Sequence, residues 1–131
     1  MTISRLEEML DLHLRAAKLT PVREYRLFAE MVGMGKGLRQ RLDAAGMRDF
    51  RFDFCFLEEK LLIEVDGGIY SGGRHTRGAG FEDDCTKINQ AVLMGYRVLR
   101  FGPTAIRSGV ALQCIEAALK TKWSQTWVVE A

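Results

Sequence analysis

The 131-residue chain has little of several features, and each scarcity excludes a class of protein. Its three cysteines (Cys55, Cys85 and Cys114) are odd in number and widely spaced and form no CxxC pair, so neither a disulfide framework nor a zinc site is suggested. No apolar run approaches the roughly 20 residues that a helix needs to cross a bilayer, and residues 1–15 lack the apolar stretch of a signal peptide. We therefore expect a cytoplasmic protein with reduced thiols and no membrane association.

An excess of either charge is also lacking, since 19 lysine and arginine residues oppose 17 acidic residues for a net charge of +2. That balance is weak evidence for a polyanionic partner, although arginine recurs from position 23 to position 107. The chain contains no repeat, low-complexity tract or linker. Its 47% apolar and 27% charged residues are ordinary for a globular protein, so residues 1–131 are expected to form a single domain.

Hydrophobic periodicity predicts an α/β fold. Helical spacing is found over residues 4–18, 38–45, 81–94 and 103–122, and alternation typical of strands over 22–28, 49–56, 60–66 and 96–101. Ser4 followed by Glu7 fits a capping box. A helix between the last two strands allows them to be parallel neighbours. The expected architecture is a mixed central sheet of about four strands flanked by helices, and the tail, residues 123–131, would add a short edge strand.

Three carboxylates stand out in the segment RFDFCFLEEKLLIEVDG, residues 51–67. Asp53 lies on one predicted strand, and Glu64 and Asp66 lie at the end of the next. A hairpin turning at residues 57–60 would bring the three together at one end of a sheet. Carboxylates that close repel one another unless a cation lies among them. Oxygen ligands alone suit Mg²⁺ or Mn²⁺, so the segment predicts a divalent-metal site; a solvated polar face is the alternative.

The same alternation predicts which side chains share a face. Four phenylalanines would point one way from the first strand, while Arg51, Asp53 and Cys55 would point the other way; these are Phe50, Phe52, Phe54 and Phe56. On the second strand, Leu62, Glu64 and Asp66 would share a face. The acids would then stand on the polar side of both strands.

Basic and further acidic residues complete the set of candidate catalytic and binding groups. On the predicted helix, Asp84 and Lys87 share a face; Lys87 would stabilise charge on a phosphate, or the two would form a surface ion pair. In the glycine-rich loop that precedes it, His75 is a candidate general base or acid. Arg51, Arg74 and Arg77 are candidate nucleic-acid contacts. Glu7 and Glu24 are additional candidate catalytic acids, although each alone is more typical of a surface or structural charge.

Taken in order, these motifs resemble a known superfamily. Asp53 is followed by a turn, an apolar strand ending Glu-x-Asp-Gly at residues 64–67, a helix with Asp-x-x-Lys at 84–87, and Gly-Tyr-Arg-Val-Leu-Arg-Phe at 95–101. This order resembles the restriction-endonuclease-like PD-(D/E)xK superfamily. It is closest to the branch of small proteins akin to very short patch repair endonucleases, often found in bacterial and phage genomes. The resemblance covers residues 51–101.

The resemblance implies a restriction-endonuclease-like core, a DNA substrate and Mg²⁺-dependent phosphodiester cleavage. Asp53 matches the first metal-binding aspartate, and Glu64 matches the acid of the (D/E)xK motif. The chain departs from the pattern at Asp66, which stands in the place of the motif's lysine, and at Tyr70, where relatives often have histidine. Lys87 or His75 would then have to supply the missing group.

The leading hypothesis is a metal-dependent DNA endonuclease in repair, recombination or phage DNA processing. It would bind one or two Mg²⁺ or Mn²⁺ ions and no small-molecule cofactor, and a homodimer would allow it to cut both strands. The alternative is a catalytically degenerate nucleic-acid-binding module of the same fold, whose binding would be salt-sensitive and independent of metal. A third reading is a nuclease subunit that needs a partner protein.

Overall fold

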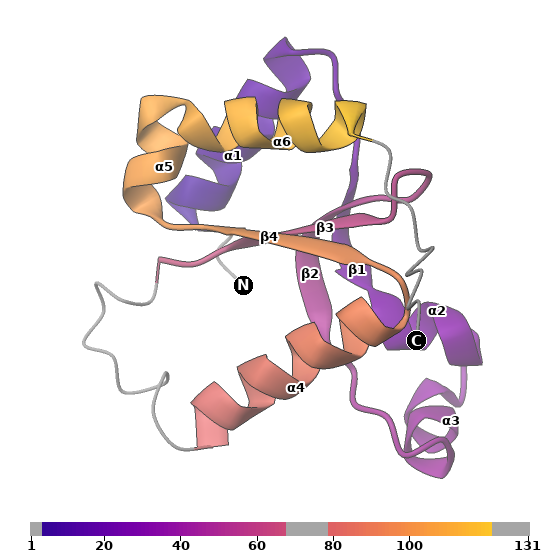
Figure 1. Cartoon of the computed structure of the whole chain (residues 1–131). Coiled ribbons are helices and arrows are strands. Elements are labelled where there is room, and N and C mark those ends of the chain that lie inside the picture. The colour runs from indigo at the N-terminus through magenta and orange to yellow at the C-terminus, as the bar shows by residue number, and fades with distance from the viewer. Residues whose placement is uncertain (1–3, 68–78, 122–131) are drawn as a thin grey trace, which may run out of the picture.

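The computed structural model describes residues 4–67 and 79–121. Its centre is a four-stranded sheet with the order β1-β2-β3-β4 (Figure 1). The strands are β1 (Val22–Arg26), β2 (Arg51–Phe56), β3 (Leu61–Val65) and β4 (Arg97–Phe101). The first three form an antiparallel meander, and β4 runs parallel to β3. The predicted mixed sheet is confirmed.

Helices cover both faces of this sheet. On one face lie α1 (Arg5–Ala16), α5 (Pro103–Ser108) and α6 (Val110–Lys120), and on the other lies α4 (Ala79–Leu93), which connects β3 to β4 (Figure 1). Two short helices, α2 (Leu27–Val32) and α3 (Leu38–Ala44), lie beyond the end of β1 (Figure 1). Among the described residues, no helix is long and apolar enough to cross a membrane.

Each face has its own apolar core. The core under α1, α5 and α6 contains Leu10, Leu14, Phe54, Phe56, Leu61, Ile63, Phe101, Ile106, Ala111 and Ile115. The core on the side of α4 contains Tyr25, Leu27, Phe28, Leu42, Phe52, Cys55, Leu62 and Ala91. All three cysteines are free thiols, and Cys55 is buried. The sheet is therefore the middle of three layers, and side chains from β2 and β3 reach both cores.

The expected elements are largely present, with two corrections. The Ser4 hydroxyl accepts the Glu7 backbone N–H at 3.0 Å, which is one of the two hydrogen bonds of the predicted capping box; the Glu7 carboxylate instead accepts from Arg23. The strand expected over 22–28 ends at Arg26, and α2 begins at Leu27. The single helix expected over 103–122 is two helices, because Gly109 adopts a φ of +85° between them. The edge strand expected over 123–131 lies outside the described residues.

The predicted common face for four phenylalanines is wrong. Phe54 and Phe56 belong to the core beneath α1, whereas Phe50 and Phe52 pack with the core beside α4. The change occurs at Asp53, whose carboxylate accepts the Val65 backbone N–H at 2.6 Å. The side chain of Asp53 thus hydrogen-bonds directly to the backbone of β3, and the regular alternation of side chains along β2 is interrupted at this residue.

Candidate metal centre

Three carboxylates from three different elements converge at one point. Glu7 comes from α1, Glu24 from β1 and Asp53 from β2, and one oxygen of each lies within 4.8 Å of the others. Glu7 is only 6% exposed. Two oxygens on one Mg²⁺ lie at most about 4.2 Å apart, so small side-chain adjustments suffice for shared coordination. These three residues fit a divalent cation by donor type, number and spacing.

The strand register explains why Glu24 meets Asp53. Arg23 pairs with Phe54 and Tyr25 pairs with Phe52, so Glu24 stands opposite Asp53. Glu24 itself has a φ of +51°, a left-handed backbone conformation that is uncommon for glutamate. Such strain persists only where the surrounding structure imposes it, and it is concentrated at functional sites.

Glu7 is held in place by an arginine network. The Arg23 guanidinium lies 2.8 Å from the Glu7 carboxylate, 3.2 Å from Glu8 and 3.3 Å from Asp11. The same guanidinium stacks over the ring of Phe54, 5.5 Å from its centroid. Arg23 therefore fixes the first turns of α1 against β1 and directs Glu7 toward the other two acids.

Burial and mutual repulsion make these acids easier to protonate. Burial is the largest cause that raises the pKa of Asp53, and the nearby charges of Glu64 and Glu24 raise it further. Burial also raises the pKa of Glu7 and of Glu24 more than any other cause, and each of these acids has a neighbouring carboxylate that adds to the effect. Three crowded carboxylates with raised pKa values favour binding of either protons or a cation.

A lysine–glutamate pair lies beside this acidic group. The Lys87 ammonium, from α4, is 2.8 Å from Glu64 on β3 and 4.4 Å from the ring centroid of Phe52. The other oxygen of Glu64 accepts the Asp53 backbone N–H at 3.3 Å. Burial raises the pKa of Glu64, and the charge and hydrogen bond of Lys87 act against that rise. Glu64 therefore links the backbone of Asp53 to a partly buried cation.

Asp66 takes part in a different cluster. Its carboxylate lies 2.8 Å from the Arg100 guanidinium on β4, which is also 3.2 Å from Asp84 on α4. The acidic group that the structure assembles is thus Asp53 with Glu7 and Glu24, whereas the sequence predicted a metal site of Asp53 with Glu64 and Asp66. Glu64 and Asp66 each have a cation, and those ion pairs hold their carboxylates in other clusters.

Some of the other predicted site residues lie in the described part of the chain, and others lie outside it. Asp84 and Lys87 lie on α4 as expected but pair with Arg100 and Glu64 in place of each other. Arg51 is exposed at the start of β2, and its charge lowers the pKa of Glu24, against the larger effect of burial. His75, Arg74 and Arg77 lie outside the described residues.

Sequence reasoning missed the supporting arginines. Neither Arg23 nor Arg100 was singled out for a role, yet Arg23 pairs with three acids of α1 and Arg100 pairs with Asp66 and Asp84. The available signal was position: Arg23 directly precedes Glu24, and Arg100 is the second arginine of the Gly-Tyr-Arg-Val-Leu-Arg-Phe motif. Neither position reveals which acids would lie within reach.

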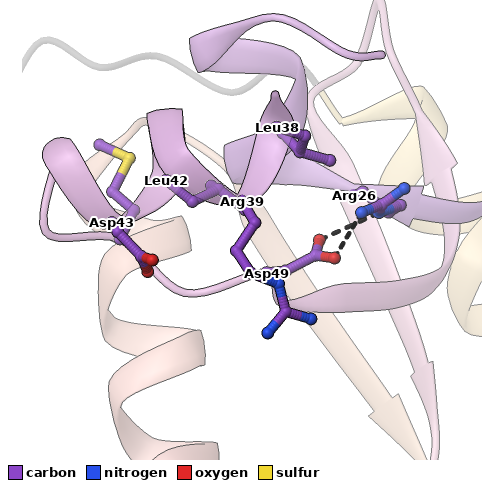
Figure 2. Close-up of a pocket in the computed structure, with 7 residues that line it drawn as sticks. Arg26, Leu38, Arg39, Leu42, Asp43 and Asp49 are labelled. Carbon is purple, nitrogen blue, oxygen red and sulfur yellow. Dashed lines mark hydrogen bonds and ion pairs between the residues drawn. The ribbon is translucent and has the colours of Figure 1, made fainter. Parts of the chain in front are cut away.

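A cavity of about 430 Å³ lies apart from these acids, between α3, the end of β1 and the segment before β2 (Figure 2). The Arg26 guanidinium binds both oxygens of Asp49 there, at 3.0 and 2.5 Å. That contact is the main cause of a lowered pKa for Asp49. None of the clustered acids lines this cavity, so it is not part of the candidate metal centre.

Comparison with known proteins identified no similar protein. No protein-family model, curated protein or solved structure matches the chain. A functional assignment therefore depends on the residues and distances given above.

Proposed function

We propose that this protein is a divalent-metal-dependent nuclease that hydrolyses phosphodiester bonds of DNA, with a restriction-endonuclease-like core. The observation that carries the proposal is the convergence of Glu7, Glu24 and Asp53 within 4.8 Å, beside the cation of Lys87. An acidic group binds the metal, and an adjacent cation attracts the substrate's phosphate, so the two together suit phosphoryl chemistry.

In this proposal each side chain has a separate role. Glu7, Glu24 and Asp53 would hold Mg²⁺ or Mn²⁺, which when bound would lower the pKa of a water molecule and polarise the phosphate. Lys87 neutralises the negative charge that develops on the phosphate oxygens. Glu64 keeps Lys87 at the site through the 2.8 Å ion pair, and its other oxygen is tied to the Asp53 backbone. His75 remains the candidate for proton transfer, and Arg51, Arg74 and Arg77 for contacts with the strand.

Lys87 can also take the role of the lysine that the superfamily motif has and this chain lacks. Asp66 stands where the motif's lysine is expected, and it is paired with Arg100. The Lys87 ammonium lies against Glu64, the residue that matches the motif's acid. A lysine from α4 can thus supply the charge that the motif would otherwise place on β3.

Nicking of supercoiled plasmid tests this function. We expect Mg²⁺ or Mn²⁺ to support nicking by the wild-type protein, and Asp53→Asn to reduce the rate by at least about 100-fold. Asp43→Asn is a matched control, because Asp43 is exposed on α3 and lies outside the acidic group. Equal background from wild type and Asp53→Asn on duplex, nicked, mismatched and branched DNA would exclude the nuclease. Metal-independent binding by both would then favour the degenerate binding module.

A further inference from the structure

The cavity between α3, the end of β1 and the segment before β2 has an apolar wall (Figure 2). Its volume of about 430 Å³ lies within the range of about 300–1,000 Å³ that is typical of pockets for small organic ligands. Leu38, Leu42 and Met47 form the apolar part of the lining, and all three pack with the core beside α4. Because that core holds them in place, the cavity offers a preformed apolar surface to a planar ring.

One end of this cavity has an excess of positive charge. Arg26 and Asp49 neutralise each other there through their two hydrogen bonds. Arg39 also lines the cavity, is exposed, and forms no ion pair within the part of the chain that the structure describes. Its side chain extends toward Asp49, whereas the other acid of the lining, Asp43, lies at the opposite end (Figure 2). A guanidinium beside an apolar wall suits a ligand that has both an aromatic ring and an anionic group.

Arg51 lies near both this cavity and the acidic group of the candidate metal centre. It is exposed and stands opposite Arg26 in the pairing of β1 with β2. Glu24 and Asp53 each lie two residues away along these same strands, which is a distance of about 7 Å. Arg26 is the main cause of the lowered pKa of Asp49, and the charge of Arg51 lowers it further. Burial raises the pKa of Glu24, and the charge of Arg51 acts against that rise. A strand with one phosphate at the acidic group can therefore reach the cavity with a neighbouring nucleotide.

We propose that this cavity receives an unstacked nucleobase of the DNA substrate, from a nucleotide near the bond that is cut. The apolar wall contacts the base, and the guanidinium groups of Arg39 and Arg51 contact the phosphates on either side of it. A base within a duplex is paired and stacked, so only an unpaired or extruded base can enter a concave site. The inference rests on the proposed nuclease function and adds a substrate class to it, namely DNA that is unpaired beside the cut.

Fluorescence anisotropy with Asp53→Asn protein tests the proposal without cleavage. A labelled single-stranded oligonucleotide should bind at least about tenfold more tightly than the fully paired duplex of the same sequence. Adding Met47→Ala should weaken binding of the single strand about fivefold. Adding Arg39→Ala should reduce the slope of log K against log[salt] by about 0.7. Arg107→Ala should change neither, because Arg107 is exposed on α5 and α5 lies far from α3 (Figure 1). Melting curves verify that each variant is folded.

An abasic oligonucleotide of the same length distinguishes contact with bases from contact with phosphates. It retains every phosphate, so Met47→Ala should not weaken its binding, whereas Arg39→Ala should. Equal losses with Met47→Ala on the normal and the abasic strand, or no loss with either variant on the normal strand, would overturn the inference. Equal binding of the single strand and the duplex would also overturn it. Competition by a free deoxynucleoside monophosphate as strong as that by the oligonucleotide would assign the cavity to a free nucleotide instead.

Binding and nicking are separate measurements, so this inference and the proposed function can fail separately. If the wild type nicks plasmid and the cavity variants bind single strands as tightly as Asp53→Asn does, the base-binding cavity is refuted and the nuclease is retained. If the wild type does not nick but Met47→Ala still weakens binding of the normal strand alone, the nuclease is refuted and the cavity is retained as a base-binding site.

Discussion

Glu24 combines a strained backbone with a half-buried carboxylate among other acids. Its φ of +51° costs about 1–3 kcal/mol, and asparagine tolerates that conformation better than glutamate. We predict that Glu24→Asn raises the free energy of unfolding by about 1 kcal/mol in EDTA, because it relieves strain and removes one of three crowded charges. The same substitution should abolish Mg²⁺-dependent nicking. Urea denaturation and the plasmid assay measure the two effects.

Lys18 provides the matched control for backbone strain. It has a φ of +61° and is exposed, at the end of α1 and outside the acidic group. Lys18→Asn should therefore gain stability and keep full nicking activity. A Glu24→Asn protein that is less stable than wild type in EDTA would show that Glu24 is not under strain.

At the residue scale, the sequence predicts the acids better than their partners. Asp53, Glu64 and Lys87 are recognisable because motif order places Asp53 on one strand, Glu64 near the end of the next strand, and Lys87 on the helix that follows. The approach of Glu7 and Glu24 to Asp53 depends on how α1 packs over β1 and on a left-handed residue within a strand. Neither feature leaves a signal in local periodicity.

At the scale of elements, α4 brings Lys87 from the far face of the sheet to the acids. We predict that Lys87→Met lowers kcat for nicking by about 100-fold, because the positive charge beside the phosphate is lost. Methionine retains the packing of the alkyl chain against Phe52. Mn²⁺ affinity, measured by calorimetry, should not change, because Lys87 pairs with Glu64 and the proposed metal ligands are other residues.

A double variant distinguishes the role of the Lys87 charge in nicking from its contribution to stability. Lys87→Met leaves Glu64 without its cation in a partly buried position, which destabilises the fold. Adding Glu64→Gln should restore the melting temperature but not the activity. Recovery of nicking in the double variant would refute a direct role for the lysine charge.

The junction between α5 and α6 depends on the backbone of Gly109. Its φ is +85°, and a Cβ placed there would have no neighbour within 4 Å, so only conformation opposes a side chain. We predict that Gly109→Ala lowers the free energy of unfolding by about 1 kcal/mol. Gly102→Ala is the control: it has a φ of −88° and its Cβ would meet the nearest atom at 3.9 Å, so urea denaturation should detect little change. Equal losses of unfolding free energy in Gly109→Ala and Gly102→Ala would show that the backbone conformation of Gly109 is not what opposes a side chain there.

Elements were predictable where local pattern and tertiary environment agree. The hairpin, the crossover helix and the parallel last strand follow from alternation, turn residues and length. Two features required tertiary information. Phe52 and Phe54 face different cores on either side of Asp53, whose carboxylate accepts the Val65 N–H. The break at Gly109 lies in a continuous helical pattern, where glycine alone does not decide between a tolerated residue and an end.

For the whole molecule, the proposed metal site predicts that stability depends on pH and on divalent metal. Burial raises the folded-state pKa values of Asp53, Glu7 and Glu24 above their ordinary values of 3.8, 4.5 and 4.5. The stability they contribute is complete below those ordinary values and is lost as pH rises through the raised folded values. In EDTA, we therefore predict that the free energy of unfolding decreases as pH rises through these raised pKa values. The decrease should be less steep in Asp53→Asn.

Mg²⁺ should reverse that loss, because it binds the deprotonated carboxylates of the folded protein alone. At a concentration 100 times the Kd, the ion adds about 2.7 kcal/mol. The difference in melting temperature with and without Mg²⁺ should thus increase from pH 4 to pH 8. A difference that is constant over this range, or absent in the wild type, would contradict the coupling.

The location of a bound Mn²⁺ ion tests the central claim most directly. In crystals soaked with MnCl₂, the anomalous difference map should show a peak coordinated by Glu7, Glu24 and Asp53. The Lys87–Glu64 ion pair should remain intact beside it. A peak held by Glu64 and Asp66 in place of Glu7 and Glu24, or no peak at any of these acids at saturating Mn²⁺, would contradict the account.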